Sequence, residues 1–225
     1  MAKKESPKVK ESRSLFSRMG VPAVSPKVLG ILEVVLGVAL LPFVYGSTVA
    51  FGREFFLMPK AAQAAFGAGV GVFLAVHFFI WEPEEVYLFG QDILLRIFSP
   101  FKHIVNIAPY LLPVYTIAVF AVYELIAIFR PHNIFLGYAM FLFGVTSALH
   151  IVFSARALRS KGDDSFKGDY IFGAASAYII NLMILSLFLG VMFKEFSFIN
   201  FCVIAYMLGK GVFVAIFRQL FVPRG

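Results

Sequence analysis

The chain has 225 residues, of which 60% are hydrophobic and only 15% are charged, and its mean hydropathy is +0.85. Soluble domains usually carry about 25% charged residues, so this composition excludes an ordinary soluble globular domain. The net charge of +7 could indicate nucleic-acid binding. In so apolar a chain it is better explained by basic residues in loops that lie at an anionic membrane face. The single cysteine, Cys202, excludes an internal disulfide and a zinc knuckle.

The first 27 residues differ from the rest, with seven Lys or Arg, five Ser and three Pro. They lack the apolar run of a cleavable signal peptide, so we predict a mobile basic cytoplasmic arm over residues 1–27.

Six apolar runs follow the arm, and each is near or above the roughly 20 residues that a helix needs to cross a bilayer. Continuous apolar runs favour helices over the alternating strands of a membrane barrel. We therefore predict an all-α polytopic membrane protein, with one transmembrane domain over 28–225. The predicted spans are 28–50, 63–82, 104–129, 133–156, 169–193 and 197–221.

The distribution of Lys and Arg predicts the orientation of these spans. With the N-terminus in the cytoplasm, the cytoplasmic segments hold 15 Lys or Arg residues and the outer segments hold 4. This bias predicts that both termini are cytoplasmic.

Two segments depart from a simple pattern of spans and loops. The apolar stretch 86–98 is too short to cross a bilayer, so we predict a short membrane-associated helix there. An interfacial helix, a re-entrant helix and a kinked extension of the second span remain open as interpretations of this segment.

Pro109 and Pro113 are expected to kink the third span.

Ionisable side chains within spans are costly and are candidates for specific roles. Glu33 and Lys210 are predicted to form a structural pair, because a Lys side chain can reach about 6 Å along a span. His77 and His150 lie at similar depth, and we interpret them as helix-contact residues rather than as haem or metal ligands. Gly67 and Gly71 form a G-x-x-x-G pattern that predicts close helix packing.

Three stretches carry a family resemblance. They are HFFIWEPEEVYLFGQDILLR from His77, NIAPYLLPVYT from Asn106, and FGVTSALHIVFSARALR from Phe143, followed by DDSFKGDYIFG and YIINL. In order and spacing these stretches, over roughly residues 70–190, resemble bacterial site-2-protease-like membrane metalloproteases of the M50 type. The resemblance implies a multi-pass protein of the bacterial inner membrane.

The sequence departs from this family at the catalytic motif. The family's H-E-x-x-H holds zinc with two His, and its Glu activates the zinc-bound water. Here the corresponding positions are Gln91, Asp92 and Leu95. Since Gln is a poor zinc ligand and Leu is none, we expect no catalytic residues, no metal and no cofactor.

The resemblance therefore implies a pseudoprotease, in which His77, Asp92, His150 and Asn181 line a polar groove at the former active site. We expect a scaffold or accessory subunit that binds membrane lipids, other membrane proteins or partner transmembrane helices, and no nucleic acid. The alternatives are a structural subunit of a complex unrelated to proteolysis, a residual metal-dependent enzyme around Asp92, and a transporter. The transporter is least favoured because the sequence shows no inverted repeat.

Overall fold

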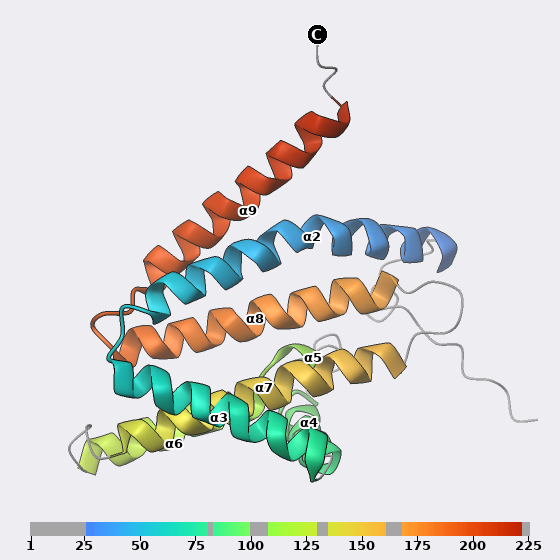
Figure 1. Cartoon of the computed structure of the whole chain (residues 1–225). Helices are drawn as coiled ribbons and strands as arrows, with labels where there is room; N and C mark the ends of the chain where they lie inside the picture. The colour runs from blue at the N-terminus through green and yellow to red at the C-terminus, as the bar shows by residue number, and fades with distance from the viewer. Residues whose placement is uncertain (1–25, 81–82, 100–107, 130–134, 161–167, 222–225) are drawn as a thin grey trace, which may run out of the picture.

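The computed structural model describes residues 26–80, 83–99, 108–129, 135–160 and 168–221, and every regular element within these ranges is a helix (Figure 1). The predicted all-α class is therefore confirmed. The predicted arm lies, up to residue 25, outside the described residues. The helices are α2 (Pro26–Phe55), α3 (Lys60–Phe79), α4 (Glu84–Ile97), α5 (Ala108–Leu111), α6 (Val114–Phe129), α7 (Leu136–Ser160), α8 (Gly168–Met192) and α9 (Phe198–Phe221).

Five helices are long and apolar enough to cross a membrane, namely α2, α3, α7, α8 and α9. They occupy the first, second, fourth, fifth and sixth predicted spans, and with α6 they alternate in direction along the chain (Figure 1). The chain thus has the helices of a multi-pass membrane protein.

The third predicted span, 104–129, is not one continuous helix. Residues 104–107 lie outside the described part of the chain; α5 then ends at Leu111 and α6 begins at Val114. Pro113 has no backbone N–H and disfavours helical geometry at the preceding residue, so it breaks the helix, whereas we expected only a kink. The remaining apolar helix, α6, has 16 residues, or about 24 Å, which is short of the ~30 Å hydrocarbon core.

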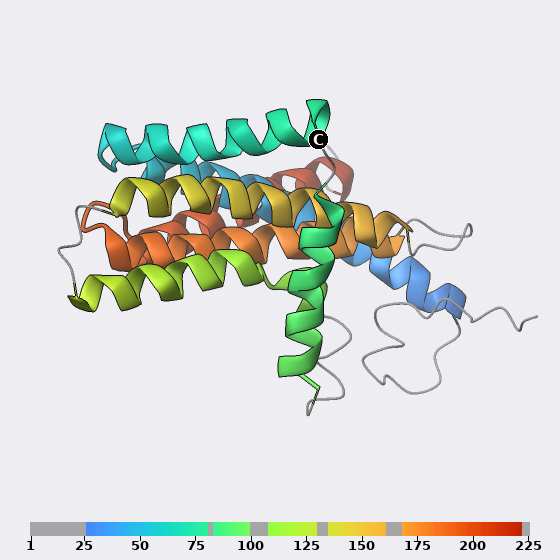
Figure 2. The same cartoon turned by 90° about the horizontal axis from the view of Figure 1, so that it is seen from below.

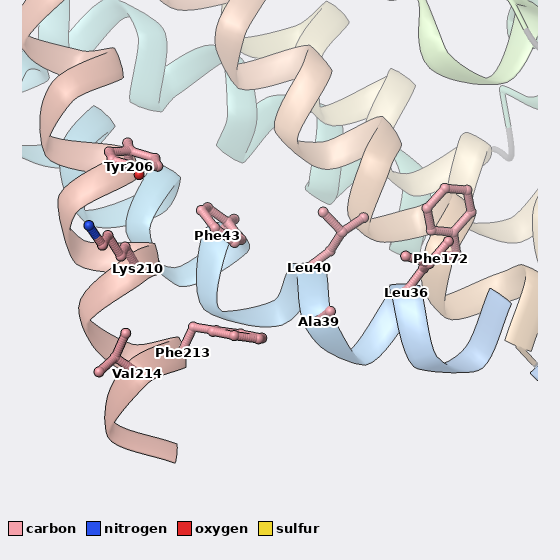
Figure 3. Close-up of a pocket in the computed structure, with 9 residues that line it drawn as sticks. All are labelled: Leu36, Ala39, Leu40, Phe43, Phe172, Tyr206, Lys210, Phe213 and Val214. Atoms are coloured by element: carbon pink, nitrogen blue, oxygen red, sulfur yellow. The ribbon is translucent and has the colours of Figure 1, made fainter. Parts of the chain in front are cut away.

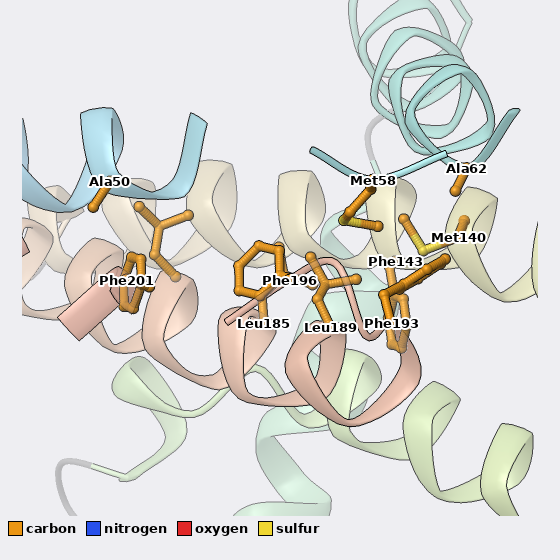
Figure 4. Close-up of a cluster of buried hydrophobic side chains, with 11 residues drawn as sticks. Ala50, Met58, Ala62, Met140, Phe143, Leu185, Leu189, Phe193, Phe196 and Phe201 are labelled. Atoms are coloured by element: carbon orange, nitrogen blue, oxygen red, sulfur yellow. The ribbon is translucent and has the colours of Figure 1, made fainter. Parts of the chain in front are cut away.

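The long helices form a row in the order α9, α2, α8, α7 and α3, with α6 packed on α7 (Figures 1 and 2). Short turns join α2 to α3 and α8 to α9 at one end of this row. The main core lies at the same end, where apolar side chains from five helices and both turns meet (Figure 4). Its fully buried members include Ala50, Met140, Phe143, Leu185, Leu189 and Phe201.

Glycines set the closest contacts between spans. A Cβ atom on Gly69 of α3 would collide with the Phe141 carbonyl oxygen, and one on Gly144 of α7 would collide with the Phe66 carbonyl oxygen. Gly67 and Gly71, which the G-x-x-x-G pattern singled out, face open space. The prediction of close packing in the second span was correct, but it named the wrong glycines, because the contact face of α3 runs through Gly69.

Candidate functional site

The short helix α4 crosses the row of spans instead of continuing α3 (Figure 2). Its buried residues, Tyr87, Gly90, Gln91 and Leu94, recur at helical spacing and form one face. The Tyr115 hydroxyl of α6 donates a hydrogen bond to the Val86 carbonyl oxygen, and the Tyr115 ring packs against Gly90. This contact fixes which residues of α4 face the bundle.

The three positions of the degenerate zinc motif point in different directions. Gln91 is buried against the bundle beside the Tyr87 hydroxyl, whereas Asp92 is exposed and Leu95 is 40% exposed. Consecutive residues on a helix are about 100° apart, so packing Gln91 inward turns Asp92 away. Burial raises the pKa of Tyr87 to about 12, and the neighbouring Gln91 side chain opposes this shift, although the Tyr87 hydroxyl makes no hydrogen bond among the described residues.

His150 and Asn181 lie at the same level on facing helices. Phe143 of α7 and Phe188 of α8 stack with ring centroids 6.4 Å apart. His150 lies seven residues after Phe143, and Asn181 lies seven residues before Phe188. Seven residues are close to two helical turns, and α7 and α8 run in opposite directions (Figure 1), so these two polar side chains share one level and one interface.

Both of these side chains are buried, with 4% of His150 and 0% of Asn181 exposed. The Leu111 backbone carbonyl of α5 accepts a hydrogen bond from the His150 imidazole, and the Tyr87 ring of α4 lies 6.2 Å away. Within the described residues, Nε2 of His150 and both amide atoms of Asn181 have no hydrogen-bond partner. His150 is therefore a buried polar side chain beneath α4 and α5.

His77 lies apart from His150. Its ring stacks on Phe73 at 5.8 Å and meets the edge of Phe153 at 5.4 Å. Phe153 in turn lies 5.7 Å from Tyr87, so two aromatic rings stand between the histidines. Of the predicted polar groove, His150 and Asn181 lie at one level on the adjacent helices α7 and α8, while His77 packs among Phe rings and Asp92 is exposed.

Glu33 and Lys210 are not brought together. Glu33 is fully buried in α2. Gly209, next to Lys210, packs on the Phe43 ring, and ten residues of helix, or about 15 Å, separate Phe43 from Glu33. The exposed Lys210 places its ammonium 5.9 Å from the centroid of the Tyr206 ring.

A second candidate site is the α2–α9 groove, a cavity of about 530 Å³ (Figure 3). Phe43 and Phe213 extend into it from the two helices, and Lys210 stands on its outer side with its ammonium turned away from α2. The groove opens because α9 diverges from α2 toward its C-terminal end (Figure 1). Its lining residues are Leu36, Ala39, Leu40, Phe43, Phe172, Tyr206, Lys210, Phe213 and Val214.

Sequence reasoning did not identify this groove. The spacing of Tyr206, Lys210 and Phe213 on one side of the last span was a readable signal. The opposing residues of α2 lie about 170 positions away in the chain, and no local pattern relates them to α9.

Sequence reasoning also missed the buried carboxylate of Glu54 near the end of α2. Its Oε2 accepts a hydrogen bond from the Ser197 backbone N–H at 2.9 Å, and the Ser197 hydroxyl accepts one from the Asn200 N–H at 3.2 Å. Ser197 directly precedes α9 and is recognisable as an N-cap from sequence, but its distant acidic partner is not.

Comparisons with protein-family models, with curated proteins and with solved structures gave no match.

Proposed function

We propose that this chain is a non-catalytic, site-2-protease-like membrane protein that acts as a scaffold or accessory subunit and binds partner transmembrane helices. The observation that carries this proposal is the open α2–α9 groove. Around it, among the described residues, α9 carries large apolar side chains that are at least partly exposed; these include Met207, Phe213, Val214 and Ile216.

The shape of this surface supports helix binding. This apolar surface lies between two spans that approach each other at one end, where Gly46 packs on the Ala205 backbone. In a bilayer, helices associate by close packing and by polar contacts between spans. The groove offers an apolar lining for packing and the polar groups of Lys210 and Tyr206.

The absence of protease activity is supported by the residues at the motif. Gln91 faces the bundle, Asp92 faces away from it and Leu95 has no donor atom, so this set does not fit a zinc ion. In the described part of the chain, no three His, Cys, Asp or Glu side chains gather in a way that would hold a metal. We also infer residence in a bacterial inner membrane with both termini in the cytoplasm, on the resemblance and the charge bias.

In-membrane photo-cross-linking tests helix binding. A photoreactive phenylalanine analogue would replace Phe213 or Met207 beside the groove and, as a matched control, exposed Val122 on α6. We expect discrete cross-links to another membrane protein from the groove positions. Failure to cross-link from every exposed position, with the purified chain monomeric in mild detergent, would contradict the proposal.

A further inference from the structure

Lys210 is a charged side chain at the middle of a span. It is the thirteenth of 24 residues in α9, so about 16–18 Å of helix lies on either side of it. A Lys side chain reaches about 6 Å along a helix, which is well short of either end of α9. A cation at this depth is costly unless a partner compensates it.

The described part of the chain supplies Lys210 with an aromatic ring but with no opposite charge. The Lys210 ammonium lies 5.9 Å from the Tyr206 ring centroid, and among the described residues no carboxylate pairs with it. The other residues that line the groove are apolar, apart from the Tyr206 hydroxyl. The groove therefore has an apolar lining with the Lys210 ammonium on its outer side, and the complement of this surface is an apolar body that carries one negative charge.

The depth of Lys210 favours a helix over a lipid as that complement. Lipid phosphates and carboxylates lie at the interfaces, outside the reach of this ammonium, whereas an Asp or Glu within a transmembrane helix lies at any depth along its span. Among the described spans, Glu33 and Glu54 are buried, and Glu124 is the eleventh of the 16 residues of α6 and only partly exposed. The described spans of a second copy thus offer no fully exposed acid.

We propose that the α2–α9 groove binds a transmembrane helix of a different protein that carries an Asp or Glu near the middle of its span, and that Lys210 pairs with this carboxylate. The proposal rests on the helix-binding function above and adds the chemistry of the partner. Lys210 and the Tyr206 hydroxyl, one turn apart, supply two donors for the carboxylate, while Phe43, Phe213 and Val214 contact the apolar sides of the helix.

Defined peptides in lipid vesicles test this pairing. The probe is a synthetic helix of about 23 Leu and Ala residues with Asp, Asn or Leu at its centre, and energy transfer to the labelled full-length chain measures association. We expect the Asp peptide to bind about tenfold more tightly than the Leu peptide, which is the size of effect that polar contacts between spans have in model systems. The Asn peptide should be intermediate or weak, because it carries no charge.

Variants assign the effect to one side chain. Lys210→Met keeps the length of the side chain and should abolish the preference for Asp, and Lys210→Arg should retain it. Lys194→Met, in the exposed turn before α9, is the matched control and should bind as the wild type does. Circular dichroism and gel filtration establish that each variant folds. An Asp preference that survives in Lys210→Met would overturn the proposal.

Other outcomes separate this inference from the proposed function. Equal binding of the three peptides, together with photo-cross-links to partner helices at other faces, would overturn the pairing and leave the scaffold function intact. Lys210-dependent retention of phosphatidylglycerol without peptide binding would assign the groove to lipid. The loss of both peptide binding and all cross-links would remove both proposals.

Discussion

Single residues decide how closely the spans approach, most clearly at Gly144. A Cβ atom there would collide with the Phe66 backbone, which cannot move without separating α3 from α7. We expect Gly144→Val to lower the free energy of unfolding by about 1–3 kcal/mol, as overpacking usually does. Thermal unfolding in detergent measures it. Gly71→Val, in open space on α3, is the control, and an equal loss in both variants would contradict the role of Gly144.

The buried amide of Asn181 is a second residue-scale test. Neither of its polar atoms has a hydrogen-bond partner among the described residues, and a buried unsatisfied polar group costs about 1–3 kcal/mol. We therefore expect Asn181→Leu to unfold at the same or a higher temperature than the wild type. Asn200→Leu, on the exposed part of α9, is the control. A marked loss of stability confined to Asn181→Leu would show that the amide has a stabilising partner.

Neither depth along a span nor direction around it was fully predictable at this scale. The sequence placed Glu33 and Lys210 at depths that allowed contact, but the packing of Gly209 on Phe43 puts about 15 Å of α2 between their levels. Likewise, Gln91 and Asp92 are neighbours in the motif, and one faces the bundle while the other is exposed. The side on which a helix packs depends on its tertiary neighbours, such as Tyr115 against α4.

At the scale of the helices, the N-terminus of α9 is capped partly by Glu54 of α2, whose carboxylate accepts a hydrogen bond from the Ser197 backbone N–H. A carboxylate near a helix N-terminus is stabilised by the helix dipole, and a hydrogen bond to a charged group contributes about 1.5–3 kcal/mol. We expect Glu54→Ala to destabilise the chain by about that amount and to speed amide exchange at the start of α9. Hydrogen–deuterium exchange measures this. Glu195→Ala, exposed in the same turn, should leave the exchange unchanged.

The docking of α4 should depend on alkaline pH through Tyr87. Burial raises the pKa of its phenol from 10.0 to about 12, so the folded state favours the neutral form. This contribution, about 2–3 kcal/mol for two units, is fully present below pH 10 and is lost between pH 10 and 12. In Tyr87→Phe, tyrosinate absorbance should lose one late-titrating group. Identical titration curves for both proteins would contradict this prediction.

The spans themselves were predictable because length and hydropathy determine them locally. Five predicted spans correspond to single helices, while the third is broken at Pro113. The break was foreseen only as a kink, because Pro kinks or ends a helix according to whether neighbouring groups satisfy the freed carbonyls. Those neighbours are not visible in the local sequence.

At the scale of the whole molecule, the order of the helices in the row could not be predicted from the sequence pattern. α2 packs between α8 and α9, which lie more than 100 residues later in the chain, and the groove exists only through that pairing. The bias of Lys and Arg nevertheless predicts the orientation of the whole bundle in the membrane. The helices alternate in direction, so the α2–α3 and α8–α9 turns lie at one end (Figure 1).

Labelling of single cysteines tests that orientation. In a Cys202→Ser background, Lys60→Cys and Lys194→Cys place a thiol at the end where both turns lie, and Arg156→Cys and Arg218→Cys place one toward the opposite end. Because the 15-to-4 bias of Lys and Arg assigns the latter end to the cytoplasm, a membrane-impermeant maleimide should label the first two thiols in intact cells and the others only after permeabilisation. The reverse pattern would show that the protein has the opposite orientation in the membrane. Mixed labelling at one end would contradict the alternation of the spans. An inverted chain would still hold Lys210 at mid-depth, so the pairing proposed for the groove does not depend on this result.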